Sequence, residues 1–391
     1  MFVIKAKRGK ERKIKNLYPN LFQDEIVDII GEGDMGLAHL FSAEDEYIGT
    51  GLFNRKSNKA FRLLSNKPVE ITEAFFRDVF KTALKKRSHL FHSGCFRLVN
   101  AESDFLPGVI IDKYDRVFVM QIRHPVWTAY KLLMVDALYD LFDDIQGVYE
   151  RSDFESSVED SLQRHSGLLR GEVPNEQFIT ENAIRYKISI PFGQKTGFFM
   201  DQRDNRQIVG QLVQRYNLEG SKGLDLFSFT GSFSFSMAKA RLQTLGVDKS
   251  QEDIDLAKEN AKLNQLDHQC RFFCNDVFEL SGLKPEYKMI VLDPPSLVKD
   301  KQDKHFGKRK FTELVKKGLE FLETPGIMGL CSCAYHIGID ELEEALRRGC
   351  ESFGYYGTIV DIGLQASDHP WMVQIPESLY LKCLWVYIDS V

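Results

Sequence analysis

The stretch GLDLFSFTG, residues 223–231, reads as a short buried strand that ends in a turn. The glycine at its end lets the backbone approach a ligand closely, just before the next helix presents free N–H groups. Strand-like and helix-like segments alternate on both sides of this stretch, as in AIRYKISI, IDLAKENAKLNQL, MIVLDPPS and YLKCLWVYI. This alternation predicts a mostly parallel sheet with helices on both faces.

Polar residues stand where the strands of this predicted sheet end, which is where doubly wound sheets bind ligands. Asp248 ends the second strand, 23 positions after Asp225 in the first. An acidic residue there suits a ribose diol, because a carboxylate accepts both hydroxyl protons. Asp276 ends the third strand, where it can receive an exocyclic amine of adenine, and Asp293 opens the D-P-P after the fourth. No G-x-G-x-x-G motif is present, so a nicotinamide dinucleotide is not favoured.

Two acids followed by D-P-P, in this order along the strand ends, resemble the class I S-adenosylmethionine methyltransferases. Taken alone, Asp248 would serve equally well as a helix cap. The resemblance implies a Rossmann-like domain that binds S-adenosylmethionine. The expected cofactor-binding residues are Asp225, Phe227, Thr230, Gly231, Asp248, Asp276 and Gln202.

The rest of the chain divides by pattern. Its 391 residues suggest two or three domains, and 43% hydrophobic with 27% charged residues is an ordinary globular balance. Short alternating pieces with frequent turn signals predict a small β-barrel over residues 1–72, and mixed helix and strand patterns predict a central α+β domain over residues 73–176. Residues 177–391 would form the α/β domain.

Cysteine and charge content limit the classes of function. Seven cysteines without a secretion signal favour reduced thiols in a cytoplasm. The sequence contains no run of about 18 apolar residues, so no membrane-spanning helix is expected. Cys270, Cys274, Cys331 and Cys333 have C-x3-C and C-x-C spacings that are unusual for zinc, so no metal is expected. The net charge is −5, yet residues 1–20 carry seven Lys/Arg and residues 299–310 carry six. Such runs are solvated surface or local phosphate contacts.

Two kinds of methyl transfer fit the strand ends. Enzymes that methylate amino nitrogens also use D-P-P, usually followed by an aromatic residue, but Ser296 stands there. A cysteine at the end of the fifth strand, GLCSCAYH, could instead add to C6 of a cytosine and make C5 nucleophilic. Asp293 could then hydrogen-bond the N3/N4 edge of the base. Cys331 and Cys333 point to the same face of a strand, so both could line the site.

The strings GQKTGFFMDQRDNR, LDLFSFTGSFS, LDPPSLVK and CSCAYH together resemble the 23S ribosomal RNA large-subunit 5-methylcytosine methyltransferase family. The resemblance extends to the N-terminal region, which is similar to that family's RNA-binding PUA segment. It implies 5-methylcytosine formation in 23S rRNA, with Cys333 in the family's S-C-S-like triplet as nucleophile. Asp293, from the argument above, is the expected second catalytic residue. Ala334 departs from the triplet's usual serine. A homodimer is plausible because the first two domains would expose sheet edges.

The string GQKTGFFMDQRDNR predicts a turn between two glycines and then a helix capped by Asp201, with Asp204 at the third position. On one interpretation it is only a connector with Arg203 and Arg206 in solvent. On the other, Gln202 binds the amino-acid end of the cofactor, and the helix start with Arg203 attracts its carboxylate. Two further hypotheses stay open for the whole chain: an RNA amino-group methyltransferase, and an RNA-binding protein whose methyltransferase domain has decayed.

Overall fold

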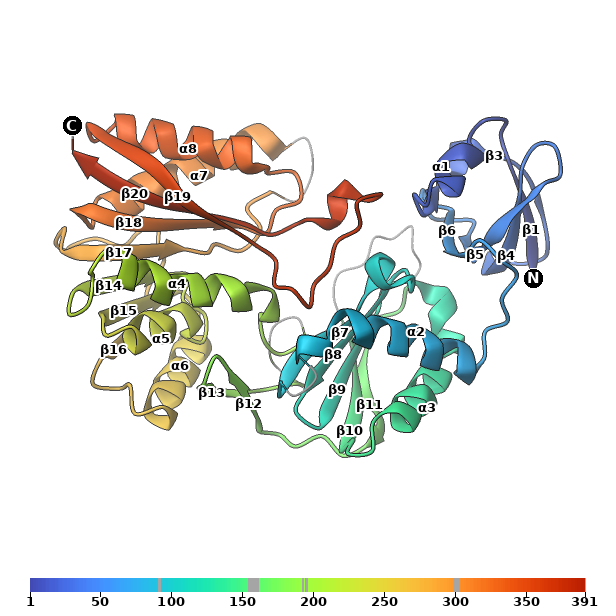
Figure 1. The fold of residues 1–391 in the computed structure, drawn as a ribbon, viewed down its shortest axis with the longest axis horizontal. Coiled ribbons are helices and arrows are strands. Elements are labelled where there is room, and N and C mark those ends of the chain that lie inside the picture. Colours follow the sequence, from blue (N-terminus) through green and yellow to red (C-terminus); the bar gives the residue numbers. More distant parts are fainter. Residues whose placement is uncertain (91–92, 154–161, 192, 194–195, 299–302, 391) are drawn as a thin grey trace. The chain divides into compact units, whose positions relative to one another are not determined.

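The computed structural model describes residues 1–90, 93–153, 162–191, 193, 196–298 and 303–390. The chain forms two compact units, each assembled from separate stretches of sequence (Figure 1). The first unit comprises Met1–Ile179, Ile188–Met200 and Asp368–Ser378, and the second comprises Thr180–Lys187, Asp201–Ser367 and Leu379–Val391. The boundaries inferred at 72/73 and 176/177 remain a prediction.

The N-terminal part of the first unit is a six-stranded sheet in the order β2-β6-β5-β4-β1-β3, with a short helix α1 (Glu11–Lys15). Many of its basic side chains are paired with acids of the same sheet region, such as Lys5 with Asp45 and Lys15 with Glu46, both at 2.6 Å. The basic run at the N-terminus is therefore largely neutralised locally. The strands are β1 (Phe2–Ala6), β2 (Asn20–Leu21), β3 (Ile26–Ile30), β4 (Met35–Phe41), β5 (Tyr47–Asn54) and β6 (Phe61–Ser65).

The central part of the first unit is a five-stranded sheet in the order β11-β10-β9-β8-β7, packed against α2 (Glu73–Lys86) and α3 (Lys131–Leu141). Thr72 caps α2 by accepting the backbone N–H of Phe75 at 3.3 Å. Phe76 and Phe80 then place their rings in the core of this part. The strands are β7 (Cys95–Asn100), β8 (Val109–Tyr114), β9 (Val117–Ile122), β10 (Gly147–Ser152) and β11 (His165–Gly171).

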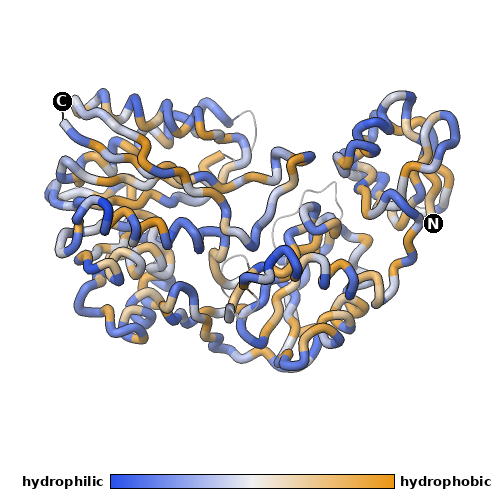
Figure 2. Tube along the Cα trace, in the orientation of Figure 1, coloured by the Kyte–Doolittle hydropathy of each residue, from blue (hydrophilic) through white to orange (hydrophobic). Residues whose placement is uncertain are grey.

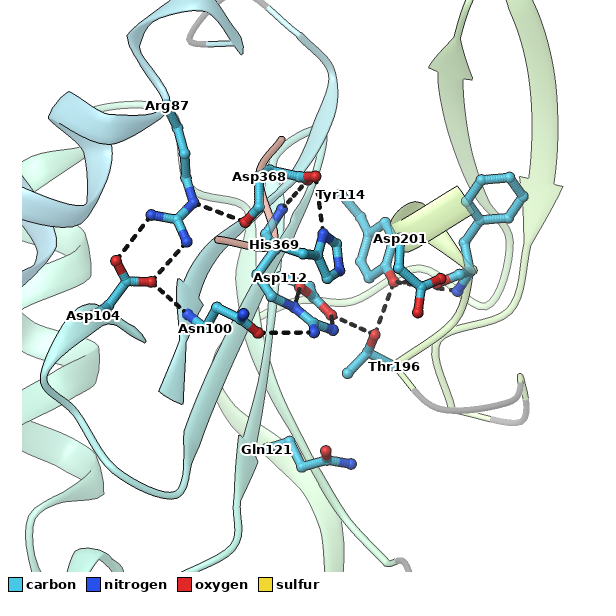
Figure 3. A network of polar contacts seen from close by, with 12 residues as sticks. Arg87, Asn100, Asp104, Asp112, Tyr114, Gln121, Thr196, Asp201, Asp368 and His369 are labelled. Carbon is cyan, nitrogen blue, oxygen red and sulfur yellow. Dashed lines mark hydrogen bonds and ion pairs between the residues drawn. The ribbon is translucent and has the colours of Figure 1, made fainter. Parts of the chain in front are cut away.

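A buried polar network joins the three segments of the first unit (Figure 3). Arg97 on β7 forms a two-bond ion pair with Asp112 on β8, at 2.8 and 3.0 Å. The hydroxyl of Thr196 donates to Asp112 at 2.6 Å, which attaches the segment 188–200 to the central sheet. The side-chain carboxylate of Asp368 accepts a hydrogen bond from the backbone N–H of Arg97 at 2.8 Å. The backbone carbonyl oxygen of Asp368 accepts one from Nε of Arg87 at 3.1 Å. The segment 368–378 is attached in this way.

The imidazole of His124 is fully buried in the first unit. Neither ring nitrogen has a hydrogen-bond partner within the part of the chain that the structure describes. Burial lowers the pKa of His124 to about 3, and the positive charge of Arg62 adds to the effect. The folded protein therefore keeps this ring neutral at pH values where an exposed histidine is charged.

Acid is expected to destabilise the protein through this ring. The unfolded chain takes up a proton near pH 6.5 and the folded chain only near pH 3, so stability falls as pH decreases across that window, by up to about 1.4 kcal/mol per pH unit. Urea denaturation from pH 7.5 to 4.5 measures this slope. The variant His124→Phe should show a shallower slope than the native chain, and equal slopes would contradict the expectation.

The second unit is built on a seven-stranded sheet in the order β16-β15-β14-β17-β18-β20-β19. The first five strands in this order run parallel, while β20 is antiparallel to both of its neighbours. Hydrophobic residues concentrate in these strands and hydrophilic ones in the loops (Figure 2). The strands are β14 (Lys222–Leu226), β15 (Gln243–Asp248), β16 (Cys270–Cys274), β17 (Tyr287–Leu292), β18 (Leu322–Ser332), β19 (Tyr355–Leu364) and β20 (Lys382–Ser390).

Two hydrophobic cores cover the faces of this sheet. One contains Leu212 of α4 (Arg203–Arg215) and Phe233 of α5 (Ser232–Lys239), packed with Trp385. The other contains Leu314 of α7 (Lys304–Leu319) and Leu342 of α8 (Ile339–Glu351). Helix α6 (Gln251–Leu263) lies beside β15 and β16, and β12 (Gln177–Glu181) with β13 (Ile184–Ile188) forms a separate two-stranded sheet. No helix among the described residues is long and apolar enough to span a membrane.

Candidate active site

The turn after β14 has an unusual backbone. Phe227, Phe229 and Gly231 have φ values of 67°, 49° and 87°, so left-handed residues alternate along it. A Cβ added at Gly231 would lie 2.8 Å from the ring of Phe272, so this position requires glycine for its space as well as its conformation. Strain of this kind persists where the surrounding structure holds a functional turn in place.

Asp225 stabilises the first turn of α5, the helix that directly follows this backbone turn. Its Oδ2 accepts both the backbone N–H and the hydroxyl of Ser234, at 2.8 and 2.7 Å. Burial raises the pKa of Asp225 to about 7, although the two hydrogen bonds from Ser234 act to lower it. Burial therefore favours the neutral form of this carboxyl group.

Three buried polar atoms around the turn have no hydrogen-bond partner among the described residues: Oδ1 of Asp225, Oγ of Ser228 and Oγ1 of Thr230. Buried polar atoms are normally satisfied, so several unsatisfied ones at a single strand end indicate a place where a ligand completes the bonding. The polar groups of S-adenosylmethionine fit this requirement. The residues at this strand end are therefore suited to hold that cofactor.

The next two strands add their acids at the same edge of the sheet. Asp248, at the end of β15, accepts the backbone N–H groups of Phe229 and Ser250 at 2.9 and 3.0 Å, one with each carboxylate oxygen. Each oxygen retains a lone pair for a ribose hydroxyl. Asp276 follows β16, is exposed, and accepts the backbone N–H of Phe278 at 2.8 Å. The binding roles predicted for both acids remain predictions.

Gln202 directly contacts the D-P-P carboxylate. Its Nε2 donates to Oδ1 of Asp293 at 2.9 Å, and its Oε1 accepts from Asn205 at 2.5 Å. The side chain is buried, so its orientation is set by two protein partners. Gln202 thus holds Asp293 in a fixed position. The sequence did not indicate this contact between the two side chains. The bond from Gln202 to the cofactor stays a prediction.

The predicted capping of α4 is wrong. The helix starts at Arg203 with Gln202 at the N-cap and no side-chain cap, because a 3-10 turn (Met200–Gln202) precedes it. Asp201 instead accepts the hydroxyl of Tyr380 at 2.9 Å, and Asp204 accepts the backbone N–H of Ser367 at 3.0 Å. Both acids tie α4 to later parts of the second unit.

Arg203 and Arg206 in the first turns of α4 are buried, so the interpretation that leaves them in solvent is also wrong. Arg206 pairs with Glu181 at 2.6 Å, and the Nε of Arg203 lies 3.5 Å from the other oxygen of the same carboxylate. The carboxylate beside Arg203 in this structure is thus one of the protein's own. Gln194 and Lys195 of the same sequence string, and Lys299 and Lys301 of the second basic run, lie outside the described residues.

The two cysteines at the end of β18 have different surroundings. Cys331 is fully buried, and its thiol lies 2.6 Å from the thiol of Cys383 on β20. Burial raises the pKa of both thiols, which keeps them neutral. Cys333 follows the last residue of the strand and is only half-buried. The expectation that both cysteines line the site stays a prediction, with Cys331 the more deeply buried of the two.

The four cysteines considered for zinc are not brought together. Cys270 and Cys274 lie on β16, which is separated in the sheet from the strand of Cys331 by β15, β14 and β17. Within the described ranges, no group of three or more His, Cys, Asp or Glu side chains could hold a metal ion.

Comparison with known proteins identifies the family to which the chain belongs. A family model described as S-adenosylmethionine-dependent methyltransferase matches residues 161–361, and one described as a PUA-like domain matches residues 4–66. The chain belongs to this methyltransferase family. The predicted fold class, a Rossmann-like methyltransferase domain preceded by a PUA-like domain, is confirmed, and the cofactor of the methyltransferase is S-adenosylmethionine.

Relatives of the methyltransferase match it over nearly its whole length. Proteins named ribosomal RNA large subunit methyltransferase I are 30% identical over 387 residues in Alteromonas mediterranea and 28% identical over 387 residues in Escherichia coli, each with 96% of both chains covered. A candidate SAM-dependent methyltransferase structure from Streptococcus mutans superposes with a TM-score of 0.82 at 25% identity, covering 98% of this chain and all of the other. A candidate methyltransferase solved with SAH has a TM-score of 0.83 at 24% identity, covering 99% and 100%.

Sequence reasoning missed two residues of the candidate site. Ser228 contributes one of the unsatisfied hydroxyls, and Lys382 places a buried ammonium near Cys333. A lysine at the start of the otherwise apolar strand YLKCLWVYI is a signal that could have revealed the second. Nothing in the sequence distinguishes Ser228 from an ordinary turn serine.

The variant Gln202→Ala tests which partner Gln202 serves. If it binds the amino-acid end of the cofactor, the dissociation constant for S-adenosylmethionine should rise about tenfold, the value of one good hydrogen bond to a charged group. If it serves only to orient Asp293, the rate should fall with cofactor affinity unchanged. Calorimetry with S-adenosylhomocysteine together with turnover measurements separates the two; we expect loss in both, and unchanged affinity would refute the cofactor contact.

Proposed function

We propose that this methyltransferase forms 5-methylcytosine in 23S ribosomal RNA, with Cys333 as nucleophile and Asp293 as the group that binds the base. The single observation that carries the proposal is the half-buried thiol of Cys333 at the end of β18, while the neighbouring cysteine is fully buried. The names of the relatives support the ribosomal substrate.

The strand register supports a joint action of these two residues. Leu292, just before Asp293, is paired with Leu330 on the adjacent parallel strand β18. Asp293 and Cys333 therefore follow neighbouring strands at the same edge of the sheet. This is also the edge at which the turn after β14 carries its unsatisfied polar atoms.

The chemistry assigned to the chain is the activation of a carbon that is too weak a nucleophile by itself. The Cys333 thiolate forms an S–C bond to C6 of cytosine, and the displaced ring electrons make C5 nucleophilic. Asp293, held by Gln202, hydrogen-bonds the N3/N4 edge and supports the added electron density. S-adenosylmethionine, when bound, supplies an electrophilic methyl group. The C5 proton then passes to solvent, and its bonding electrons re-form the C5–C6 double bond as the C6–S bond breaks and the thiolate leaves.

The target base must be unpaired or flipped out, because C6 and the N3/N4 edge are inaccessible inside a duplex. The PUA-like domain is a suitable source of contacts to the RNA backbone, which position a substrate without reading its sequence. The choice of a single cytosine would then depend on the fold of the RNA around it.

Methylation of rRNA by the purified protein tests the proposal. Ribosomal RNA from cells that lack the gene is incubated with the full chain and S-adenosylmethionine, and RNase fragments are analysed by mass spectrometry. The expected product is one new 5-methylcytosine in 23S rRNA. An N-methylated guanine or adenine would favour the amino-group chemistry of D-P-P enzymes, and no new methyl group in any rRNA would refute the proposal.

A further inference from the structure

Lys382 places a buried positive charge at the strand end that precedes Cys333. It is the first residue of β20 and is paired in the antiparallel register with Ser332, the last residue of β18. Only 7% of its surface is exposed. A charged group is rarely buried to this extent without a specific partner.

The partners of this ammonium are backbone carbonyls. Its Nζ donates to the carbonyl oxygens of Ile337 at 2.9 Å, Tyr380 at 3.2 Å and Ala334 at 3.5 Å. Two of these carbonyls belong to the segment immediately after Cys333, so the lysine fixes the path of the chain that carries the thiol. Among the described residues, no carboxylate forms an ion pair with Lys382.

The electrostatics link this ammonium to Cys333. Burial lowers the pKa of Lys382, and the negative charges of Cys333 and Glu341 act against that effect. Glu341 is itself paired with Lys304 at 2.7 Å. The attraction is mutual, so an ammonium at this position stabilises the thiolate form of the cysteine.

We propose that Lys382 is a positioning residue that holds the Cys333 segment through its carbonyl contacts and promotes ionisation of the thiol, whose proton passes to solvent. The proposal deepens the proposed function, because the ionised sulfur is the form that adds to C6 of the base. It assigns no covalent role to the lysine. Neutral carbonyls suit this task, since a carboxylate in their place would cancel the positive charge that the thiolate needs.

The pH dependence of Cys333 alkylation tests this role without RNA. The full-length protein reacts with iodoacetamide from pH 6 to pH 10, and mass spectrometry of the Cys333 peptide gives its rate, with the half-buried Cys274 as internal control. In Lys382→Met we expect the midpoint for Cys333 to move up by about one pH unit or more, as for the loss of a nearby opposite charge. Lys382→Arg should keep the native midpoint, and Cys274 should react identically in all three proteins.

A superimposable Cys333 profile in native protein and Lys382→Met would overturn the proposal. If Lys382→Met shows no cooperative thermal transition, Lys382→Gln replaces it, because its amide still donates to the carbonyls but carries no charge. Turnover adds a second readout: the neutral variant should lose at least tenfold in kcat at pH 7 and recover part of it at pH 9, with little change in KM. A loss that is equal at all pH values would indicate a purely structural residue.

Failure of this inference is distinguishable from failure of the proposed function. Alkylation reports on the thiol whether or not the protein methylates cytosine. Conversely, rRNA that gains 5-methylcytosine through Cys333 while the alkylation midpoint is independent of Lys382 would leave the function intact and remove only the role of the lysine.

Discussion

Replacing Cys333 with alanine is expected to abolish formation of 5-methylcytosine, with a loss of turnover of more than about a thousandfold. Without the sulfur, no bond to C6 forms, and C5 of cytosine is not nucleophilic enough to be methylated. Binding of S-adenosylhomocysteine should be unchanged, because the unsatisfied polar atoms of the proposed cofactor site belong to the turn after β14. The measurement is incorporation of labelled methyl groups into rRNA under single-turnover conditions.

The matched control for this result is Cys331→Ala. The native thiol is buried against Cys383, so its removal leaves a small cavity that costs about 1 kcal/mol of stability and should leave methylation nearly intact. RNA containing 5-fluorocytidine extends the comparison, because fluorine at C5 prevents the final elimination and traps the sulfur–carbon adduct. The native protein and Cys331→Ala should form an adduct that survives denaturation. An adduct formed by Cys333→Ala would show that another residue is the nucleophile.

The second large effect is expected for Asp293→Asn, with turnover lowered about 100-fold to 1000-fold. The amide has nearly the same shape but cannot donate an acidic proton to N3 as electron density is added to the ring. Its effect should appear in kcat, while affinity for S-adenosylhomocysteine stays within about twofold. The folded structure should persist, since the amide oxygen can still accept the hydrogen bond from Gln202.

Adduct formation again makes the Asp293 result specific. If the carboxyl group assists addition of the thiolate, Asp293→Asn should form the 5-fluorocytidine adduct slowly but completely. Full-speed adduct formation with slow methylation would move the role of Asp293 to a later step. Full-speed methylation would remove it from the chemistry altogether.

The methyltransferase part of the chain was predictable because parallel sheets place their strand ends together. The alternating pattern makes these strands visible, and the structure brings their ends to one edge of a single sheet. Asp225 is the next-to-last residue of its strand, Asp248 ends one, and Asp276 and Asp293 follow one. Their individual ligand contacts remain predictions. The choice between Cys331 and Cys333 was left to a family resemblance, since strand periodicity treats the two alike.

The contacts that the sequence did not indicate form between segments that are far apart in the chain, and local sequence patterns do not show which segments will pair. Lys382 lies near Cys333 only because β20 is inserted antiparallel between β18 and β19, although it follows both in the sequence. Burial of Arg206 depends on Glu181, which lies 25 residues earlier in a separate two-stranded sheet. The predicted helix cap at Asp201 fails for the same reason, because the carboxylate of Asp201 accepts a hydrogen bond from the distant Tyr380.

The polar network of the first unit has a consequence for synthesis of the protein. Its central sheet is encoded before residue 180, but Thr196 and Asp368, which satisfy the buried groups of Arg97 and Asp112, are translated later. A fragment that ends at residue 179 would retain the strands and lack these partners, leaving buried donors and acceptors uncompensated. The N-terminal half is therefore expected to mature only after nearly the whole polypeptide has emerged, and simple truncation is a poor route to an isolated RNA-binding fragment. A split into fragments would need to restore the segments 188–200 and 368–378 in trans.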